Sequence, residues 1–151
     1  MSSRIITRDQ SQVFLDYINS ELDTDFTSES ARTITHLRHN EDGTFAILAV
    51  AAYNNWKDYH CELSIASSSP MWASWGYIHN VFDYGFNYAN KERVNLVVDV
   101  TNSAAINMHK KLGTVLEGRL RDWFGRDKDA FLYALTKRDY EASKWFSKEN
   151  K

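Results

Sequence analysis

The feature that most constrains the fold of this chain is the nearly continuous apolar run RVNLVVDV at residues 93–100. A run of this kind is typical of a central strand that is buried on both faces. It follows a segment, beginning at Pro70, in which apolar residues recur every three or four positions, the period of an amphipathic helix. Parallel strands in one sheet are joined by such a helical crossover. We therefore expect one parallel strand pair connected by a long helix.

Three more strands are expected before this helix. Alternating segments rich in β-branched residues, separated by the turn sequences NEDG and NNWK, predict three consecutive antiparallel strands. These strands are expected at residues 31–39, 44–53 and 58–67. In the third one, Cys61 and Leu63 face one side of the sheet, whereas His60, Glu62 and Ser64 face the other.

The remaining elements complete a mixed pattern. They are a strand at 4–7, a helix at 10–22 capped by Asp9, a helix at 103–112 capped by Asn102 and ended by Gly113, strands at 114–124 and 129–136, and a helix at 139–146. This order predicts an α+β (mixed α/β) fold with a central, mostly antiparallel sheet, one parallel crossover and flanking helices. We expect residues 1–151 to form a single domain.

Composition restricts the functional classes. The formal charge of −2, with acids interspersed among the basic residues, argues against nucleic acid as a partner. No apolar run approaches the roughly 20 residues that span a membrane, and the sequence begins without the apolar core of a signal peptide. The single cysteine, Cys61, has no internal disulfide partner, and no Cys/His cluster has zinc spacing. A cytoplasmic protein without a metal is expected.

One stretch carries a fixed spacing of polar and small residues. It reads VVDVTNSAAINMHKKLGTVLEGRLRDWFGRDKDAFLYAL and holds Asn102, Ala105, Lys111, Gly113, Glu117, Gly118, Leu120, Arg121, Asp122, Gly125 and Asp129. This spacing resembles the RimJ/RimL-like branch of the GNAT superfamily of acetyl-CoA-dependent N-acetyltransferases. The resemblance implies the GNAT fold, acetyl-CoA as cosubstrate, and a primary amine as acceptor, on a protein N-terminus, a lysine or a small molecule.

The resemblance also implies where coenzyme A binds. In this family, a glycine-rich loop and the helix that follows it hold the pyrophosphate, and the corresponding residues here are SPMWAS at 69–74, without glycines. Amides at the helix start and serine hydroxyls are the remaining donors, and Asn102 is expected near the cofactor. The expected cofactor-binding residues are Ile65, Ser67, Ser69, Met71, Trp72, Ala73, Ser74, Asn102 and Ala105.

Two residues are candidates for acid and base chemistry. Glu62, in mid-strand on the polar face, is the first candidate base; the alternative is an ordinary exposed residue of a half-solvated sheet. His109 falls where many GNAT enzymes carry a general acid, and the alternative is a partly buried helix histidine. For Arg121, Asp122 and Asp129, substrate binding and a bracing role in the last hairpin are both open.

The aromatic residues leave a second function open. Trp75 lies on the apolar stripe of its helix, but Trp72 is a candidate for the core, for stacking on adenine or for a partner surface. Trp145 and Phe146 either dock onto the domain's own sheet or contact a partner or a second copy in a homodimer. The first reading is an N-acetyltransferase. The alternative is a catalytically weak GNAT-fold protein that binds and modulates another protein, such as a virus-encoded effector of a host enzyme.

Overall fold

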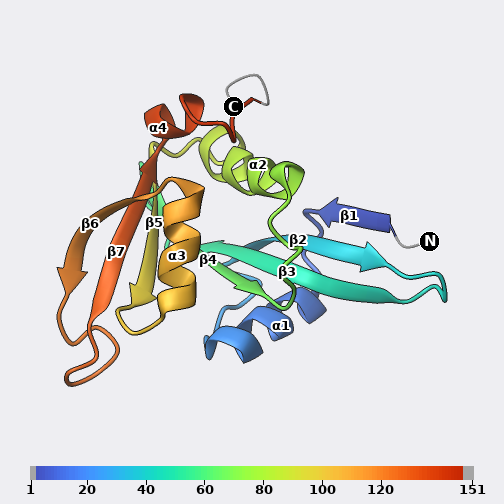
Figure 1. Cartoon of the computed structure of the whole chain (residues 1–151), viewed down its shortest axis with the longest axis horizontal. Helices are drawn as coiled ribbons and strands as arrows, with labels where there is room; N and C mark the ends of the chain where they lie inside the picture. The colour runs from blue at the N-terminus through green and yellow to red at the C-terminus, as the bar shows by residue number, and fades with distance from the viewer. Residues whose placement is uncertain (1–2, 148–151) are drawn as a thin grey trace.

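A computed structural model describes residues 3–147, which form a seven-stranded sheet with helices on both faces (Figure 1). The elements are β1 (Ser3–Thr7), α1 (Gln12–Leu22), β2 (Arg32–His39), β3 (Phe45–Asn54), β4 (His60–Ser67), α2 (Trp75–Asp83) with its π-helical extension η1 (Tyr84–Tyr88), β5 (Arg93–Asp99), α3 (Ser103–Leu112), β6 (Val115–Leu120), β7 (Ala130–Thr136) and α4 (Lys137–Glu141). The strand order is β1-β2-β3-β4-β5-β7-β6. The mixed α/β architecture with a mostly antiparallel sheet is confirmed.

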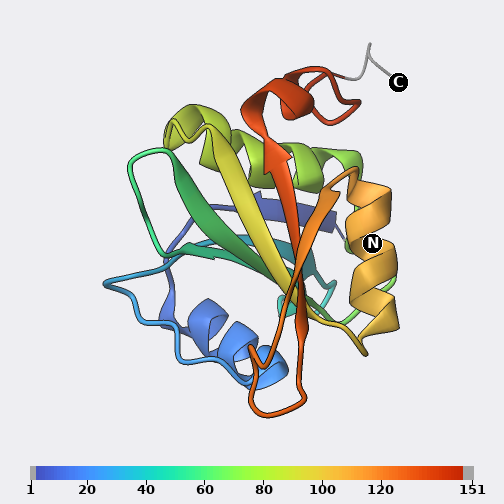
Figure 2. The ribbon, with the colours of Figure 1, turned by 90° about the vertical axis from the view of Figure 1, so that its left-hand side faces the viewer.

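Alternating residues along each strand direct two apolar cores to opposite faces of the sheet. Val50 and Ala52 of β3 pack with Phe14 and Ile18 of α1, so α1 covers one face. The larger core lies on the other face and holds the apolar side of α2 together with Leu112 of α3. Figure 2 shows α1 on the opposite side of the sheet from α2 and α3. We call these two sides the α1 face and the α2 face.

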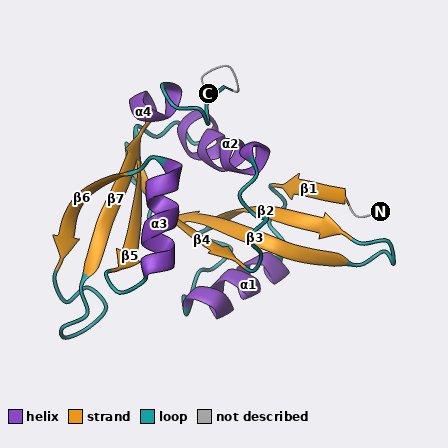
Figure 3. Cartoon of the chain, in the orientation of Figure 1, coloured by secondary structure: helices purple, strands orange, loops and turns teal. Residues whose placement is uncertain are grey.

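The parallel pair β4–β5 is short, and this positions the site. Only His60, Cys61 and Glu62 of β4 pair with residues of β5, which are Arg93, Val94 and Asn95. Beyond these pairs, both strands continue, β4 to Ser67 and β5 to Asp99, without pairing to each other. The sheet therefore opens into a V between β4 and β5, and helix α3 lies beside this gap (Figure 3).

Two predicted helix starts were wrong. The helix expected from Pro70 begins at Trp75, because the Ser74 side chain accepts the Tyr77 amide as its N-cap and the preceding residues form a turn. The N-cap of α1 is Ser11 rather than Asp9. The Gln10 side chain explains the later start, since it bonds both the amide and the carbonyl of Thr33 and holds the preceding chain against β2. The caps predicted at Asn102 and Gly113 are confirmed.

Two boundaries near the C-terminal end also differ from the expectation. Strand β6 ends at Leu120 instead of residue 124, because Asp122 adopts a φ of 55° and leaves the extended conformation. The last helix spans Lys137–Glu141 instead of residues 139–146.

The C-terminal aromatic residues dock onto the domain itself. Trp145 is buried, and its Nε1 donates to the Leu112 carbonyl at the end of α3 (2.9 Å). The Trp75 Nε1 donates to the Lys144 carbonyl (2.6 Å), and Tyr140 stacks on Phe86. The surface they cover is made by α2, its extension and α3, rather than by the sheet as expected.

Candidate active site

The gap between β4 and β5 holds a cavity of about 620 Å³ that reaches both faces of the sheet. Five of the expected site residues line it together: Glu62, Ile65, Asn102, Ala105 and His109. Further walls come from the segment after α1 and from the β6–β7 loop. Strands that separate after a few pairs leave backbone amides and carbonyls free along their facing edges, so the cavity offers hydrogen bonds to an extended ligand.

The candidate base and the candidate acid approach the cavity from opposite faces. Cys61 and Leu63 belong to the core on the α2 face, so Glu62, between them, points to the α1 face. His109 lies on α3, on the α2 face. A ligand in the gap therefore meets a carboxylate on one side and an imidazole on the other.

Glu62 is partly buried and stands opposite Asn54 of β3. Its Oε2 accepts a hydrogen bond from Asn55 Nδ2. The Asn54 Oδ1 is buried and has no hydrogen-bond partner among the residues that the structure describes. The α1 face of the cavity thus presents two neighbouring acceptors, a carboxylate and an amide oxygen, and the amide oxygen receives no donor from the described part of the chain.

His109 is buried, with 5% of its surface exposed, and its ring lies 5.2 Å from that of Tyr133. Burial lowers its pKa from 6.5 to about 4, because the apolar surroundings disfavour the charged ring. At neutral pH the side chain is therefore a neutral imidazole. The burial agrees with the alternative of a buried helix histidine, and a catalytic role for His109 stays a prediction. Within residues 3–147, its Nδ1 has no hydrogen-bond partner.

The lowered pKa predicts a pH dependence of folding stability. The unfolded chain binds a proton at His109 below pH about 6.5, whereas the folded chain does so only below about 4, so stability falls as the pH drops through this window. We expect His109→Gln to flatten the curve of unfolding free energy against pH there by up to about 1.4 kcal/mol per pH unit.

Urea denaturation at steps from pH 4 to 7.5 measures this slope for both proteins. His36, whose pKa is also lowered by burial, remains in the variant, so the difference isolates His109. Parallel curves for the two proteins would contradict the assignment.

Asn102 and Ala105 stand at the start of α3. The Asn102 side chain accepts the Ala105 amide (3.1 Å), which fixes the first turn of the helix beside the cavity. Asn102 therefore has the structural role expected of it, and contact with a cofactor at this place stays a prediction.

The segment 67–74 is arranged differently from the expectation. None of Ser67, Ser69, Met71, Trp72, Ala73 and Ser74 lines the cavity. The Met71 amide bonds to Ser69 Oγ, and the Trp72 amide bonds to the Ser69 carbonyl, so these two amides are not free to bind an anion. Contact of Met71 and Trp72 with coenzyme A is left as a prediction. Contacts of Ser67, Ser69, Ala73 and Ser74 with a phosphate stay predictions.

Trp72 is a core residue. Only 8% of its surface is exposed, its ring meets Tyr77 edge-on, and its carbonyl accepts from His36 Nδ1 (2.8 Å). Burial corrects both exposed alternatives for this residue, a stacking platform for adenine and a partner surface. It also explains the missing glycines, because this loop is anchored by a large side chain rather than shaped for a close backbone approach.

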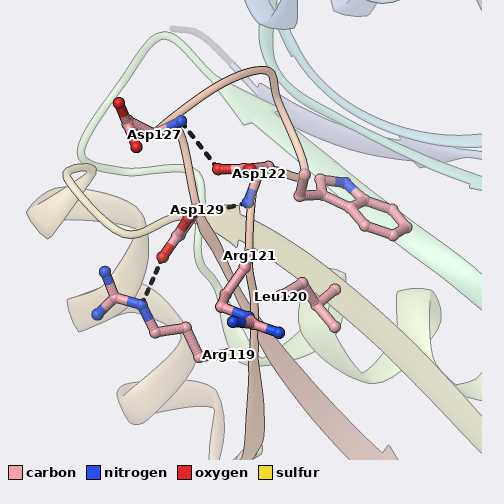
Figure 4. Close-up of a pocket in the computed structure, with 7 residues that line it drawn as sticks. Arg119, Leu120, Arg121, Asp122, Asp127 and Asp129 are labelled. Atoms are coloured by element: carbon pink, nitrogen blue, oxygen red, sulfur yellow. Dashed lines mark hydrogen bonds and ion pairs between the residues drawn. The ribbon is translucent and has the colours of Figure 1, made fainter.

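The β6–β7 loop is held by a charge network (Figure 4). Asp129 accepts from Arg119 Nε (2.8 Å) and from the Asp122 amide (2.9 Å), and these bonds hold its pKa below the usual range. Asp122 in turn accepts the Asp127 amide (2.8 Å). Asp122 and Asp129 thus brace the hairpin, one of the two roles left open by the sequence.

The cavity is also lined by residues that the sequence analysis did not identify. Trp123 and Phe124 line it from this loop, and Asp23 and Phe26 line it from the segment after α1. Their signal in the sequence was the pair WF directly after the family-like Leu-Arg-Asp. No local pattern marks Asp23, because only the fold brings the end of α1 to β4.

Comparisons with known proteins are consistent with this geometry. No protein-family model matches the chain. A protein named uncharacterized N-acetyltransferase p20, from Bacillus licheniformis, is 33% identical over 66 residues, 42% of this chain. The match spans only 37% of that relative's own length.

Solved structures are similar over most of the chain. A chimera of the spermidine N-acetyltransferase SpeG from Vibrio cholerae and hSSAT is 16% identical, with a TM-score of 0.68 over 91% of this chain and 98% of that one. The ribosomal-protein-S5-alanine acetyltransferase from Vibrio fischeri is 15% identical, with a TM-score of 0.60 over 85% of this chain and 71% of that one. The chain therefore has the GNAT N-acetyltransferase fold, as the sequence predicted.

The structure adds two observations on residues 3–147. No helix in this range is long and apolar enough to cross a membrane. No group of three or more His, Cys, Asp or Glu residues in the same range is placed to hold a metal ion.

Proposed function

We propose that this chain is an N-acetyltransferase that transfers the acetyl group of acetyl-CoA to a primary amine. The observation that carries the proposal is the cavity at the separation of β4 and β5, which brings together Glu62, Asn102 and His109 in a GNAT fold. Similar solved structures belong to N-acetyltransferases, one of them named for spermidine and another for a ribosomal protein. The spacing from Asn102 to Asp129 supports the RimJ/RimL-like branch.

In the proposed reaction, the amine nitrogen attacks the thioester carbonyl carbon, and the carbon–sulfur bond then breaks. Glu62 takes the proton that the amine loses, directly or through a water, and passes it to solvent. Free amides on the facing edges of β4 and β5 stabilise the carbonyl oxygen as it becomes negative. His109 is neutral and donates a hydrogen bond to the sulfur, so the leaving thiolate receives its proton from solvent.

The donor occupies the gap in the proposed complex. Ile65 and Ala105 contact its arm. Ser67 ends β4, and Ser69 and Ala73 lie in the turn before α2, where the positive end of the helix dipole favours the pyrophosphate. A cytoplasmic location fits this donor. The alternative of a weakly catalytic partner-binding protein is not favoured, because Trp72 and Trp145, on which it relied, are buried.

Calorimetric titration of the purified protein with acetyl-CoA and with free coenzyme A tests the proposal, together with release of the free thiol in the presence of amines. We expect micromolar binding, about −8 kcal/mol, and thiol release that depends on the amine. Absence of binding up to millimolar concentration would contradict the proposal.

A further inference from the structure

The mouth of the cavity on the α1 face is rich in carboxylates. Asp23, Glu62 and Asp99 line the cavity from three different elements, whereas Lys128 is the cation among its lining residues in the described part of the chain. Asp99 is already engaged, since it accepts from the Thr101 amide (2.8 Å) and hydroxyl (2.7 Å) and lies within the field of Lys128. All three carboxylates therefore contribute to the negative charge that an incoming molecule meets there.

Asp23 differs from the other two carboxylates. It is the residue directly after α1, and its φ of 53° turns the chain away from the helix and toward the cavity rim. Its side chain is exposed, and no lysine or arginine of residues 3–147 forms an ion pair with it. A carboxylate at the rim of a cavity, without a cation of its own, is available to a cation carried by a ligand.

Three aromatic side chains also line the cavity. Phe26 is partly buried, whereas Trp123 and Phe124 are 53% and 49% exposed, and all three line the cavity. Such rings accommodate an aliphatic chain, and their faces attract an ammonium group.

Two residues that line the same cavity carry buried polar atoms for which residues 3–147 supply no hydrogen-bond partner. They are His109, of which 5% is exposed and whose Nδ1 has no partner in this range, and Asn54, whose Oδ1 has none. The amide oxygen of Asn54 can only accept, and it stands beside Glu62 on the α1 face. Two adjacent acceptors call for a ligand that brings several N–H donors, as an amine does.

We propose that the acceptor is a small aliphatic diamine or longer polyamine. Its reacting nitrogen lies at Glu62 and Asn54, its chain runs between the aromatic rings, and its second ammonium pairs with Asp23. This inference rests on the proposed acetyl transfer and adds the class of acceptor. It also assigns to Asp23 a role in specificity, whereas Glu62 acts on the nitrogen that is acetylated.

The test compares two acceptors of equal chain length, 1,4-diaminobutane and n-butylamine, with acetyl-CoA as donor at low ionic strength. We expect kcat/KM for the diamine to exceed that for the monoamine about tenfold, and Asp23→Asn to reduce this ratio about fivefold, the range of a rim ion pair. The matched control is Asp25→Asn, an exposed carboxylate of the same segment that does not line the cavity, for which the ratio stays within about twofold.

Calorimetric titration of both amines without any donor measures the same preference independently of turnover. Equal kcat/KM values for the two amines would overturn the inference while leaving an N-acetyltransferase. Acetylation of a peptide N-terminus but of neither amine would also overturn it. Diamine binding that depends on Asp23, without any acetyl transfer, would support the acceptor site and contradict the proposed reaction. If neither amine binds or reacts, the inference fails.

Discussion

Replacing Glu62 by Gln is expected to lower kcat for acetyl transfer about a hundredfold, because the carboxylate is the base that takes the proton of the attacking amine. Glutamine has the same shape and retains an oxygen that can accept from Asn55 Nδ2, so the local structure is preserved. Without a base, only the small fraction of amine that is already deprotonated in solution can react. Steady-state release of coenzyme A with a saturating amine measures the effect.

Two controls separate chemistry from damage to the fold. Glu92→Gln removes an exposed carboxylate at the edge of β5 outside the cavity, and it should leave kcat unchanged. A rise in pH should partly restore the activity of Glu62→Gln, since more of the amine is then deprotonated. Turnover of Glu62→Gln equal to that of the parent protein, at every pH, would remove Glu62 from the mechanism and favour the alternative of an ordinary partly exposed strand residue.

Patterns with a regular period predicted the fold well. The apolar run at 93–100 indicated the buried strand β5, and alternation of apolar and polar residues indicated the strands β2, β3 and β4. Successive side chains of a strand point to opposite faces of the sheet, so a buried face requires an apolar residue at every second position. The start of α2 was misjudged for the opposite reason. Ser67, Ser68, Ser69 and Pro70 are favourable at a helix start, but Ser67 ends β4 and burial of Trp72 holds the residues after it as a turn. Tertiary packing outweighed local propensity there.

The site was predictable where it lies on regular elements. Glu62 follows from the polar face of a strand, and Asn102 and Ala105 from a helix start within a recognisable motif. Asp23 and Trp123 were missed, because they reach the cavity from loops more than thirty residues away from Glu62 in the sequence, and only the topology brings them there. The charge state of His109 was also hidden, since its pKa depends on burial that a sequence does not display.

Trp72→Ala is expected to lower the free energy of unfolding by about 3–5 kcal/mol, the range observed when a large buried aromatic side chain is truncated. The indole is in the main core against Tyr77, so its removal leaves a cavity under the turn between β4 and α2. The hydrogen bond from His36 is to the Trp72 backbone carbonyl, which alanine retains. The loss of stability therefore measures the removal of the indole side chain. Urea denaturation at pH 7.5, where His36 and His109 are neutral, measures it.

Trp123→Ala is the matched control, because this tryptophan is 53% exposed and its truncation should change stability by no more than about 0.5 kcal/mol. The two variants should also affect the binding of different ligands. Trp123→Ala should weaken amine binding at the cavity mouth, whereas Trp72→Ala should raise the Kd of acetyl-CoA by loosening the turn that carries Ser69 and Ala73. If the Trp72→Ala protein is as stable as its parent, Trp72 is not a core residue, and the partner-binding alternative is open again.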